Sequence, residues 1–434
     1  MIPRRRAWVV IGVVLASFLP APEAVAGEED WSQREILTRP GVNGNAPRLF
    51  AAADGALTAA WVATSASSLD WALVIRTRPA GGTWSIEQVI EADVSRYDIE
   101  LAVDSRLVAA YLPDDGAGPH VRTQEADGTF GPSMLLAPGL PGRVLSGPKL
   151  VVSKSGRQVV VWLQRLPGAG NRVVAVRRDG SSAAWSKPKF LTGKDARPLS
   201  IATGAARDGS VAVLWTDVMW EDGLRSFRVK HRLLSAHGEW MATEFVMQSA
   251  GVADLQVANR GSGRVTAIWV ETDELEHHAY TSSRTASGRW TPAGSIAAQP
   301  DRDELWQTLT TNGRLTAVVW SSLPSSDGDS WLMARVQDGR AWGPPRRIGR
   351  ASSRMWFNAA AFERDGALRV VWIRKQGEMR TRVRGRGGAW GPPTHITYVG
   401  LDDYRPVVVA YGDREAAVVS ATRNRRIAFA ELSQ

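Results

Sequence analysis

The sequence predicts an all-β protein, a single β-propeller of about eight four-stranded blades. A short turn is followed eight times by an apolar, β-rich run, and seven of these runs end in an aromatic residue. The markers recur every 48 to 54 residues, a period that fits one four-stranded blade. They are Trp61, Tyr111, Trp162, Trp215, Trp269, Trp320 and Trp372, with Ser420 in the eighth place. A seven-bladed ring is the alternative, because the last unit is the shortest and lacks its aromatic residue.

Each unit reads as four antiparallel strands. Asp54-Gly55 separates a first apolar strand from a second at 56–62, and further strands follow at 72–78 and 84–90. Asp-Gly tolerates positive φ, so it predicts a two-residue hairpin between the first and second strands. The fourth strand opens with an aromatic residue after a glycine-rich turn. These residues are Trp84, Phe130, Trp185, Trp240, Trp290, Trp342 and Trp390.

The two ends of the chain are predicted to close the ring. Residues 427–432 form a third strand with no fourth strand after them, and the eighth aromatic residue, Trp31, lies before the first unit. We expect residues 31–37 to supply the missing strand. Such a closure leaves no free sheet edge and joins the first blade to the last.

The first 26 residues are predicted to be a signal peptide. Three arginines precede an apolar stretch at 8–19, and Ala24-Val25-Ala26 follows as a small-x-small cleavage pattern. Residues 27–434 then form the propeller domain. No later segment approaches the ~20 apolar residues of a membrane helix, so no membrane span is expected. We expect a secreted or cell-envelope-associated protein, and because it has no cysteine it forms no disulfide.

The charge is uneven along the chain. Without residues 1–26, 50 basic and 43 acidic residues give a net charge of +7, and residues 340–434 alone carry 18 basic and 8 acidic residues. This basic sector is predicted to meet an anionic partner. Its candidate residues are Arg346, Arg347, Arg350, Arg354, Arg425 and Arg426. Nucleic acid is not expected as a partner of an exported protein.

Another arginine recurs about eight residues before the fourth-strand aromatic residue. It occurs as Arg76, Arg122, Arg177, Arg232 and Arg382, with Arg335 one position away. Recurrence at one position of the repeat predicts a structural role, and we expect ion pairs between neighbouring blades.

The candidate ligand-binding residues are tryptophans outside the repeating positions. In a propeller, the turns between strands one and two and between strands three and four lie on one face, here the hairpin face. The two-to-three loops and the blade crossovers share the other, here the crossover face, where long loops usually carry function. Five tryptophans fall on the crossover face: Trp71, Trp220, Trp306, Trp331 and Trp356. Their flat rings suit a sugar or a peptide side chain, and packing between crossovers is the alternative.

Charged residues at the crossover ends are weak catalytic candidates. Three arginines can hold one carboxylate, and a tyrosine beside an acid could act as a nucleophile. The residues concerned are Arg96, Arg197, Arg405, Tyr404 and Asp403. The alternative is that these charges only solvate the rim. No cofactor and no metal are predicted; acidic pairs could hold calcium, but none has an EF-hand register.

The turn before each outer aromatic residue resembles the bacterial neuraminidase repeat, or Asp-box, with the pattern Ser/Thr-x-Asp-x-Gly-x-Thr-Trp. Residues 77–84 match it except that Pro79 stands for the aspartate. The resemblance implies a β-propeller of the kind found in sialidases, other glycosidases and noncatalytic proteins. Sialidases of that family have six blades and a Tyr-Arg-Ile-Pro signature before the first blade, where residues 46–49 here read Ala-Pro-Arg-Leu. No catalytic residue is therefore carried over.

Three functions remain open. The first is an exported noncatalytic propeller that binds a glycan, a cell-wall polymer or another anionic cell-surface polymer through its loop face. The second is a sialidase-like glycoside hydrolase acting at the central mouth. The third is a scaffold for a protein partner. The oligomeric state is left open.

Overall fold

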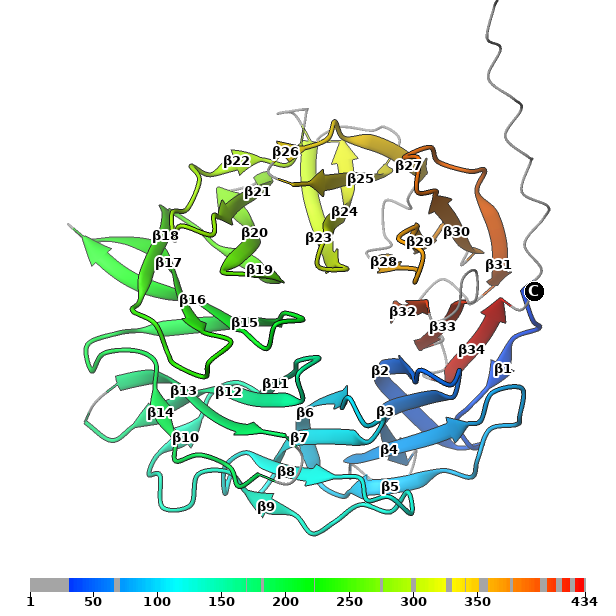
Figure 1. Ribbon diagram of the computed structural model, residues 1–434, viewed down its shortest axis with the longest axis horizontal. Helices are drawn as coiled ribbons and strands as arrows, with labels where there is room; N and C mark the ends of the chain where they lie inside the picture. The colour runs from blue at the N-terminus through cyan, green and yellow to red at the C-terminus, as the bar shows by residue number, and fades with distance from the viewer. Residues whose placement is uncertain are drawn as a thin grey trace, which may run out of the picture.

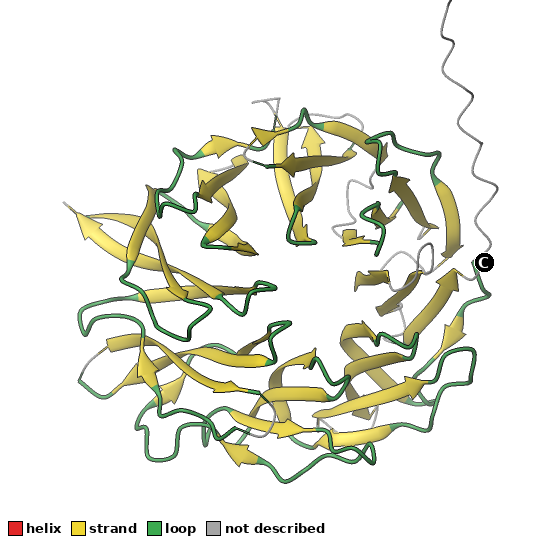
Figure 2. Ribbon diagram, in the orientation of Figure 1, coloured by secondary structure: helices red, strands yellow, loops and turns green. Residues whose placement is uncertain are grey.

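The protein is a ring of eight β-sheets around a central opening (Figures 1 and 2). The structure is a computed structural model. It describes residues 31–65, 71–168, 170–180, 183–221, 223–273, 276–297, 302–324, 330–339, 341–350, 358–374, 378–398, 404–410, 416–421 and 426–432. In this part of the chain all regular elements are strands, and no helix is long and apolar enough to cross a membrane. The prediction of an all-β propeller with eight blades is confirmed, and the seven-bladed alternative is excluded.

Each blade is one antiparallel sheet, and in blades 1 to 7 the strands run outward from the channel in chain order. Blade 1 contains β2 (Val42–Ala51), β3 (Leu57–Ser65), β4 (Trp71–Arg78) and β5 (Gln88–Glu91). Blade 2 contains β6 (Val94–Leu101), β7 (Leu107–Pro113), β8 (His120–Thr123) and β9 (Met134–Leu135). Blade 3 contains β10 (Arg143–Val144), β11 (Lys149–Val152), β12 (Arg157–Leu166), β13 (Gly170–Asp179) and β14 (Lys189–Phe190). Blade 4 contains β15 (Pro198–Ala205), β16 (Val211–Glu221), β17 (Leu224–Leu234) and β18 (Glu244–Ser249).

The second half of the ring repeats this plan. Blade 5 contains β19 (Ala253–Gly261), β20 (Arg264–Asp273), β21 (Glu276–Arg284) and β22 (Gly294–Ser295). Blade 6 contains β23 (Arg302–Thr311), β24 (Leu315–Pro324), β25 (Trp331–Asp338), β26 (Ala341–Trp342) and β27 (Arg346–Arg350). Blade 7 contains β28 (Asn358–Phe362), β29 (Leu368–Ile373), β30 (Glu378–Arg384) and β31 (Thr394–Tyr398). Blade 8 contains β32 (Tyr404–Ala410), β33 (Ala416–Ala421), β34 (Ile427–Leu432) and β1 (Glu35–Ile36). Two blades have a divided strand, because β10 and β11 both pair with β12 and β26 and β27 both pair with β25.

The N-terminal strand closes the ring, as predicted. Strand β1 pairs antiparallel with β34, so that Glu35 lies opposite Phe429, and Trp31 bridges to Leu432. The backbone N–H of Leu37 donates to the carbonyl of Ile427 at 2.8 Å. Blade 8 therefore takes its outer strand from one end of the described chain and its other three from the opposite end.

The hydrophobic core lies between blades. The seven aromatic markers of the second strands are at most 1% exposed. Alternate residues of a strand point to opposite faces of its sheet, so each blade contributes to two clusters. Trp372 of blade 7, for example, packs with Val319 and Leu332 of blade 6. The ring is thus held together by a series of interfaces between neighbouring sheets.

The Asp-Gly turns between first and second strands differ from the predicted two-residue hairpins. In blade 1, Gly55 N–H donates to the Ala52 carbonyl and Ala52 N–H donates to the Ala56 carbonyl, which leaves three residues in the loop. Gly55 has a φ of 85°, while Asp54 accepts a hydrogen bond from the N–H of Ala56 at 3.0 Å. This is a type I turn followed by a left-handed residue, which requires positive φ only at the glycine.

The recurring arginines also differ from the prediction, because most donate to main-chain carbonyls rather than forming ion pairs. Arg76 Nε donates to the Ser85 carbonyl at 2.6 Å, and its Nη1 donates to the Leu37 carbonyl of blade 8 at 2.8 Å. Arg232, Arg335 and Arg382 repeat this arrangement. Each donates to a carbonyl in the segment before the last strand of its own blade and to a carbonyl in or just after the outer strand of the preceding blade. Arg122 keeps the predicted ion pair, with Glu91 of blade 1 at 3.2 Å. A planar guanidinium satisfies two carbonyls at once, which explains arginine at this position.

Candidate functional site

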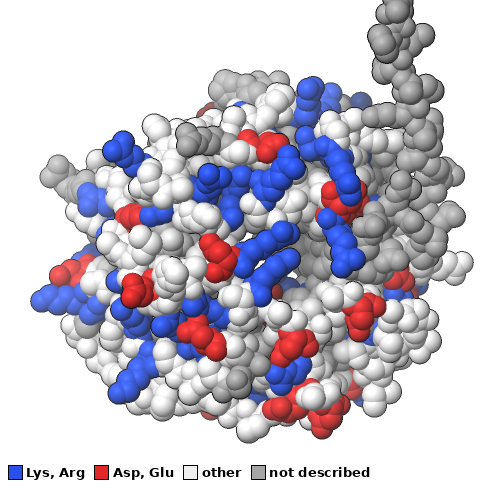
Figure 3. Space-filling model, viewed as in Figure 1, with Lys and Arg blue, Asp and Glu red and all other residues white. Residues whose placement is uncertain are grey.

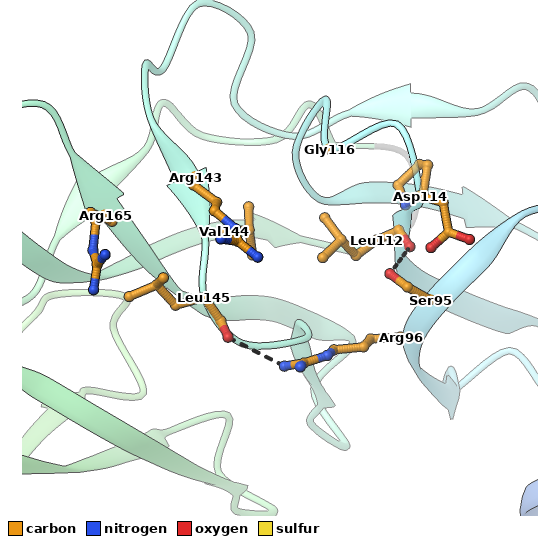
Figure 4. Close-up of a pocket in the computed structure, with 10 residues that line it drawn as sticks. Ser95, Arg96, Leu112, Asp114, Gly116, Arg143, Val144, Leu145 and Arg165 are labelled. Carbon is orange, nitrogen blue, oxygen red and sulfur yellow. Dashed lines mark hydrogen bonds between the residues drawn. The ribbon is translucent and has the colours of Figure 1, made fainter.

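Two adjacent hollows on the crossover face form the best-supported site in the described part of the chain. The first, of about 480 Å³, lies between blades 2 and 3 (Figure 4). The second, of about 510 Å³, lies where the first strands of blades 1 to 4 begin. Ser95 and Arg96, at the start of β6, line both hollows. The two hollows therefore adjoin each other beside the central mouth, and we treat them as one candidate site.

The first hollow is cationic. It is lined by Arg96, Arg143 and Arg165, and the only carboxylate among its described lining residues is that of Asp114. Arg96 Nη1 donates to the Leu145 carbonyl at 3.3 Å, and Arg165 Nε donates to Asn171 Oδ1 at 3.2 Å. Three guanidiniums near one carboxylate leave a net positive potential that favours an anion.

Arg143 has the freest guanidinium of the three. Its side chain is exposed and makes no hydrogen bond or ion pair with another residue that the structure describes. In Figure 4, Arg143 extends from β10 into the space between Leu145 and Leu112, with Arg165 on one side and Arg96 below. An incoming carboxylate or phosphate would therefore find unpaired donors, the arrangement in which charge-assisted forks are strongest.

Two glycines allow these arginines to converge. Arg143 lies opposite Arg165 in the register of β10 and β12. Gly142 has a φ of 101°, and a Cβ at this position would lie 1.9 Å from the Arg165 carbonyl oxygen. At Gly147, a Cβ would lie 2.7 Å from the Arg96 Cβ. Larger residues would thus displace β10 or Arg96, so both glycines are needed for the close approach of backbone and side chains.

The second hollow has a more apolar wall. Trp71 and Tyr97 line it together with Pro148 and Leu199. Trp71 is 39% exposed and Leu199 is 51% exposed. No carboxylate occurs among the described residues that line this hollow. An exposed aromatic and apolar wall beside a cationic hollow suits a ligand with one apolar face and one anionic group.

A charged cluster lies farther along the first strands of blades 1 and 2, beyond the residues that line the two hollows. Arg48 Nη2 lies 3.3 Å from Asp98 Oδ1, and Asp98 Oδ2 accepts a hydrogen bond from the N–H of Leu150 at 3.0 Å. Burial raises the pKa of Glu100 to about 8, with Asp98 acting in the same direction and Arg48 opposing it. Burial also raises the pKa of Tyr97, whose hydroxyl donates to the Ala46 carbonyl. Burial therefore favours the neutral form of the Glu100 carboxyl.

The predicted tryptophans lie at different places on the crossover face. Trp71 begins β4, Trp331 begins β25, and Trp220 is 58% exposed near the end of β16. All three lie at two-to-three loops, as predicted, but only Trp71 lines the paired hollows. Trp331 is half-buried under the Arg347 guanidinium, which lies 3.5 Å from its ring centroid. Trp306 belongs to β23, its side chain lies outside the described residues, and so does all of Trp356.

Of the predicted arginine triad, the structure describes the side chains of Arg96 and Arg197 only. Arg96 lines both hollows, whereas Arg197 lines neither and uses its backbone N–H to donate to Asp217 Oδ1 at 2.5 Å. The side chains of Tyr404 and Arg405, and all of Asp403, lie outside the described residues. Their predicted catalytic roles therefore stay predictions.

The predicted anion-binding arginines of the basic sector have varied surroundings. Arg346, Arg347 and Arg350 lie on β27, and Arg350 shares the Trp331 ring with Arg347 at 5.4 Å. Arg426 donates from Nε and Nη2 to the hydroxyl and carbonyl of Thr38, each at 2.8 Å. Arg426 thus stabilises the ring closure, and the donors that it uses for Thr38 are those that an anion would need. Arg354 and Arg425 lie outside the described residues.

Sequence reasoning missed Arg143, Arg165 and Leu199. Arg143 follows a glycine in an irregular crossover, and Arg165 ends an apolar strand. No spacing in the sequence connects them, because their proximity depends on the pairing of β10 with β12. Gly142 beside an arginine in a long crossover was the only signal in the sequence, and it is a weak one.

No model of a known protein family and no curated protein matches the chain. Solved structures similar to it include a lectin from Burkholderia pseudomallei, at 12% identity and a TM-score of 0.55, covering 84% of this chain and 100% of the lectin. The β-propeller domain of a trilobed protease from Pyrococcus furiosus has 10% identity and a TM-score of 0.48, covering 83% of this chain and 97% of that domain. A Hadza microbial sialidase has 13% identity and a TM-score of 0.42, covering 87% of this chain and 76% of the sialidase. At such identities the similarity shows the fold alone, and the protein is a β-propeller.

Proposed function

We propose that this protein is an exported, noncatalytic propeller that binds an acidic glycan or an anionic cell-surface polymer on its crossover face. The observation that carries the proposal is the convergence of Arg96, Arg143 and Arg165 on one hollow, which adjoins a second hollow lined by Trp71. The signal peptide at residues 1–26 and the export that it implies are part of the proposal.

The chemistry of the two hollows fits the two parts of an acidic sugar. A carboxylate, sulfate or phosphate group in the first hollow would accept hydrogen bonds from guanidiniums, and such charge-assisted bonds contribute about 1.5–3 kcal/mol each. The apolar face of the sugar ring would lie against Trp71 and Leu199 in the second hollow. The fold of a lectin is similar to that of this chain, which is compatible with the proposal.

A sialidase-like hydrolase is the second candidate function. The resemblance of residues 77–84 to the Asp-box supports it, as do Arg96 and Tyr97 at the mouth. Glycosidases generally need two carboxyl groups flanking the scissile bond. The described lining of the two hollows offers one, that of Asp114. This shortage is the reason for preferring a binding protein.

The test is an array of glycans and cell-wall polymers probed with the chain from Gly27, with fluorogenic sialosides and other glycosides assayed alongside. We expect retention of acidic polymers, loss of retention in the Arg143→Ala/Arg165→Ala variant, and no turnover. Arg289→Ala is the matched control, because Arg289 is exposed, lies in a turn of the hairpin face and makes no described side-chain contact. Turnover would replace the binding proposal with the hydrolase, and unchanged retention in the double variant would reject this site.

A further inference from the structure

A third hollow, of about 550 Å³, lies on the opposite, hairpin face of the ring. Its lining comes from blades 4, 6 and 7 and includes five arginines. They are Arg207, Arg314, Arg364, Arg384 and Arg386. The carboxylates among its described lining residues are those of Asp338 and Asp365, so the lining carries a net charge of +3. This surface, here the hairpin-face hollow, shares no lining residue with the crossover-face site.

Three of these arginines have no charge partner among the described residues. Arg386 Nε lies 3.1 Å from Asp365 Oδ2, and Arg314 Nη2 lies 3.8 Å from Asp338 Oδ2. Arg207, Arg364 and Arg384 make no side-chain hydrogen bond or ion pair within the described part of the chain. Like charges gathered around one hollow repel one another, and a bound anion relieves that repulsion.

The repeat places Arg207 and Arg364 at the channel mouth. Arg207 and Arg364 each precede the Asp-Gly of a turn between first and second strands, in blades 4 and 7. The corresponding turn of blade 6 contains Gly313, where a Cβ would lie 3.6 Å from the Cδ of Arg207. Arg207 thus reaches across from blade 4 to the turn of blade 6. In the view of Figure 3, Lys and Arg side chains gather around the central opening and over blades 6 and 7.

The walls between the arginines are apolar. Trp342 is half-buried in the lining, and Leu315 and Val336 lie beside it. A hollow of this volume is within the range of small-molecule sites, which run from roughly 300 to 1,000 Å³. The walls therefore offer space and an aromatic surface for a compact ligand body, while the guanidiniums supply the donors for its charged groups.

We infer that the hairpin-face hollow binds a compact polyanion that carries two or more phosphate or carboxylate groups. Guanidinium forks match both groups bidentately. A ligand with about three negative charges would neutralise the lining, whereas a monoanion would leave most of the repulsion in place. This site is independent of the proposed function, because it lies at the other end of the channel and uses other residues.

The experiment is isothermal titration calorimetry on the chain from Gly27, with pyrophosphate as the phosphate probe and citrate as the carboxylate probe. We expect saturable binding of at least one probe at low ionic strength, with an affinity that falls steeply as salt rises. Arg364→Ala and Arg384→Ala should each weaken binding about tenfold, since each removes charge-assisted hydrogen bonds. The stronger probe would identify which anionic group the hollow prefers.

Two controls keep the outcome attributable to this hollow. Arg289→Ala removes the same charge from the same face without touching the lining, so it should bind as the parent protein does. Arg143→Ala/Arg165→Ala should also retain binding, since it alters only the crossover-face site. Absence of saturable binding for both probes would overturn the inference. So would equal affinity of the Arg364→Ala variant and the parent protein, or loss of binding in either control.

Discussion

Ring closure rests on residues 31–37, and Leu37 allows the most direct test of it. The Leu37 side chain is fully buried in a cluster with Trp61 and Ile427 that joins blade 8 to blade 1. Leu37→Ala keeps the backbone hydrogen bonds to Ile427 and from Arg76, so it removes only the buried side chain. Burial of this kind is worth about 2–5 kcal/mol in Leu→Ala substitutions. We expect the free energy of unfolding to fall by that amount.

The assay is urea unfolding followed by tryptophan fluorescence, with circular dichroism as a second probe. Glu35→Ala is the control, because Glu35 is exposed on the same strand and should change stability by less than ~0.5 kcal/mol. Deletion of 31–37 should aggregate or unfold the protein, since it exposes the edge of β34 and leaves Arg76 Nη1 without its acceptor. A Leu37→Ala variant or a deletion as stable as the parent protein would refute closure as a source of stability.

Three further predictions concern the site, the blade contacts and pH. Gly142→Ala should displace β10 and with it Arg143. We expect the affinity for acidic polymers to fall about tenfold, as it would if the hydrogen bonds from Arg143 were lost, while the melting temperature changes little. Unchanged affinity would contradict this prediction. Arg382→Lys should lower the free energy of unfolding in urea by about 1–3 kcal/mol, because one ammonium cannot donate to both carbonyls that the Arg382 guanidinium reaches. An unchanged urea midpoint would contradict this prediction. Burial opposes ionisation of Glu244, but hydrogen bonds from Arg284 and His231 outweigh it and lower the Glu244 pKa to about 2. The ionised Glu244 should contribute about 2–3 kcal/mol to the free energy of unfolding, in full above about pH 5 and progressively less as pH falls toward 2. Glu244→Gln should therefore flatten the acidic side of a plot of stability against pH. An unaltered acidic side would exclude the pairing of Glu244 with Arg284 and His231 as its cause.

The repeat made most of the fold predictable. Each second-strand aromatic marker is a buried residue between blades, and burial imposes a regular spacing on the sequence. The displaced Trp31 predicted the closure, because an outer-strand aromatic residue that precedes the first unit can complete a blade only by pairing with the last one. The turn type was predicted less well, since Asp-Gly fits both a two-residue hairpin and a three-residue loop with one left-handed glycine.

The candidate site was predictable only in part. Arg96 and Trp71 stood out because they lie at loop ends of the crossover face, where the repeat leaves residues without a structural role. Arg143 and Arg165 did not stand out, because they are brought together by the pairing of the short strand β10 with β12. This pairing is not part of the repeat and produces no periodic pattern in the sequence. The ion pairs expected of the recurring arginines were mostly wrong for a related reason. Repetition shows that a position matters, whereas the partner depends on which carbonyls the neighbouring blade presents.

The number of arginines in the basic sector overstates how many guanidiniums can bind a ligand. Arg369 pairs with the buried Glu363 at 2.7 Å, Arg382 joins two blades, and Arg426 fastens the closure. Their guanidinium donors already have partners, and displacing those partners would cost stability without gaining a ligand. The guanidiniums of Arg364 and Arg384 donate to no side chain or carbonyl of the described residues, and both lie at the hairpin-face hollow. An anionic partner of this sector should therefore be sought first at that end of the channel, although the long loops are on the other face.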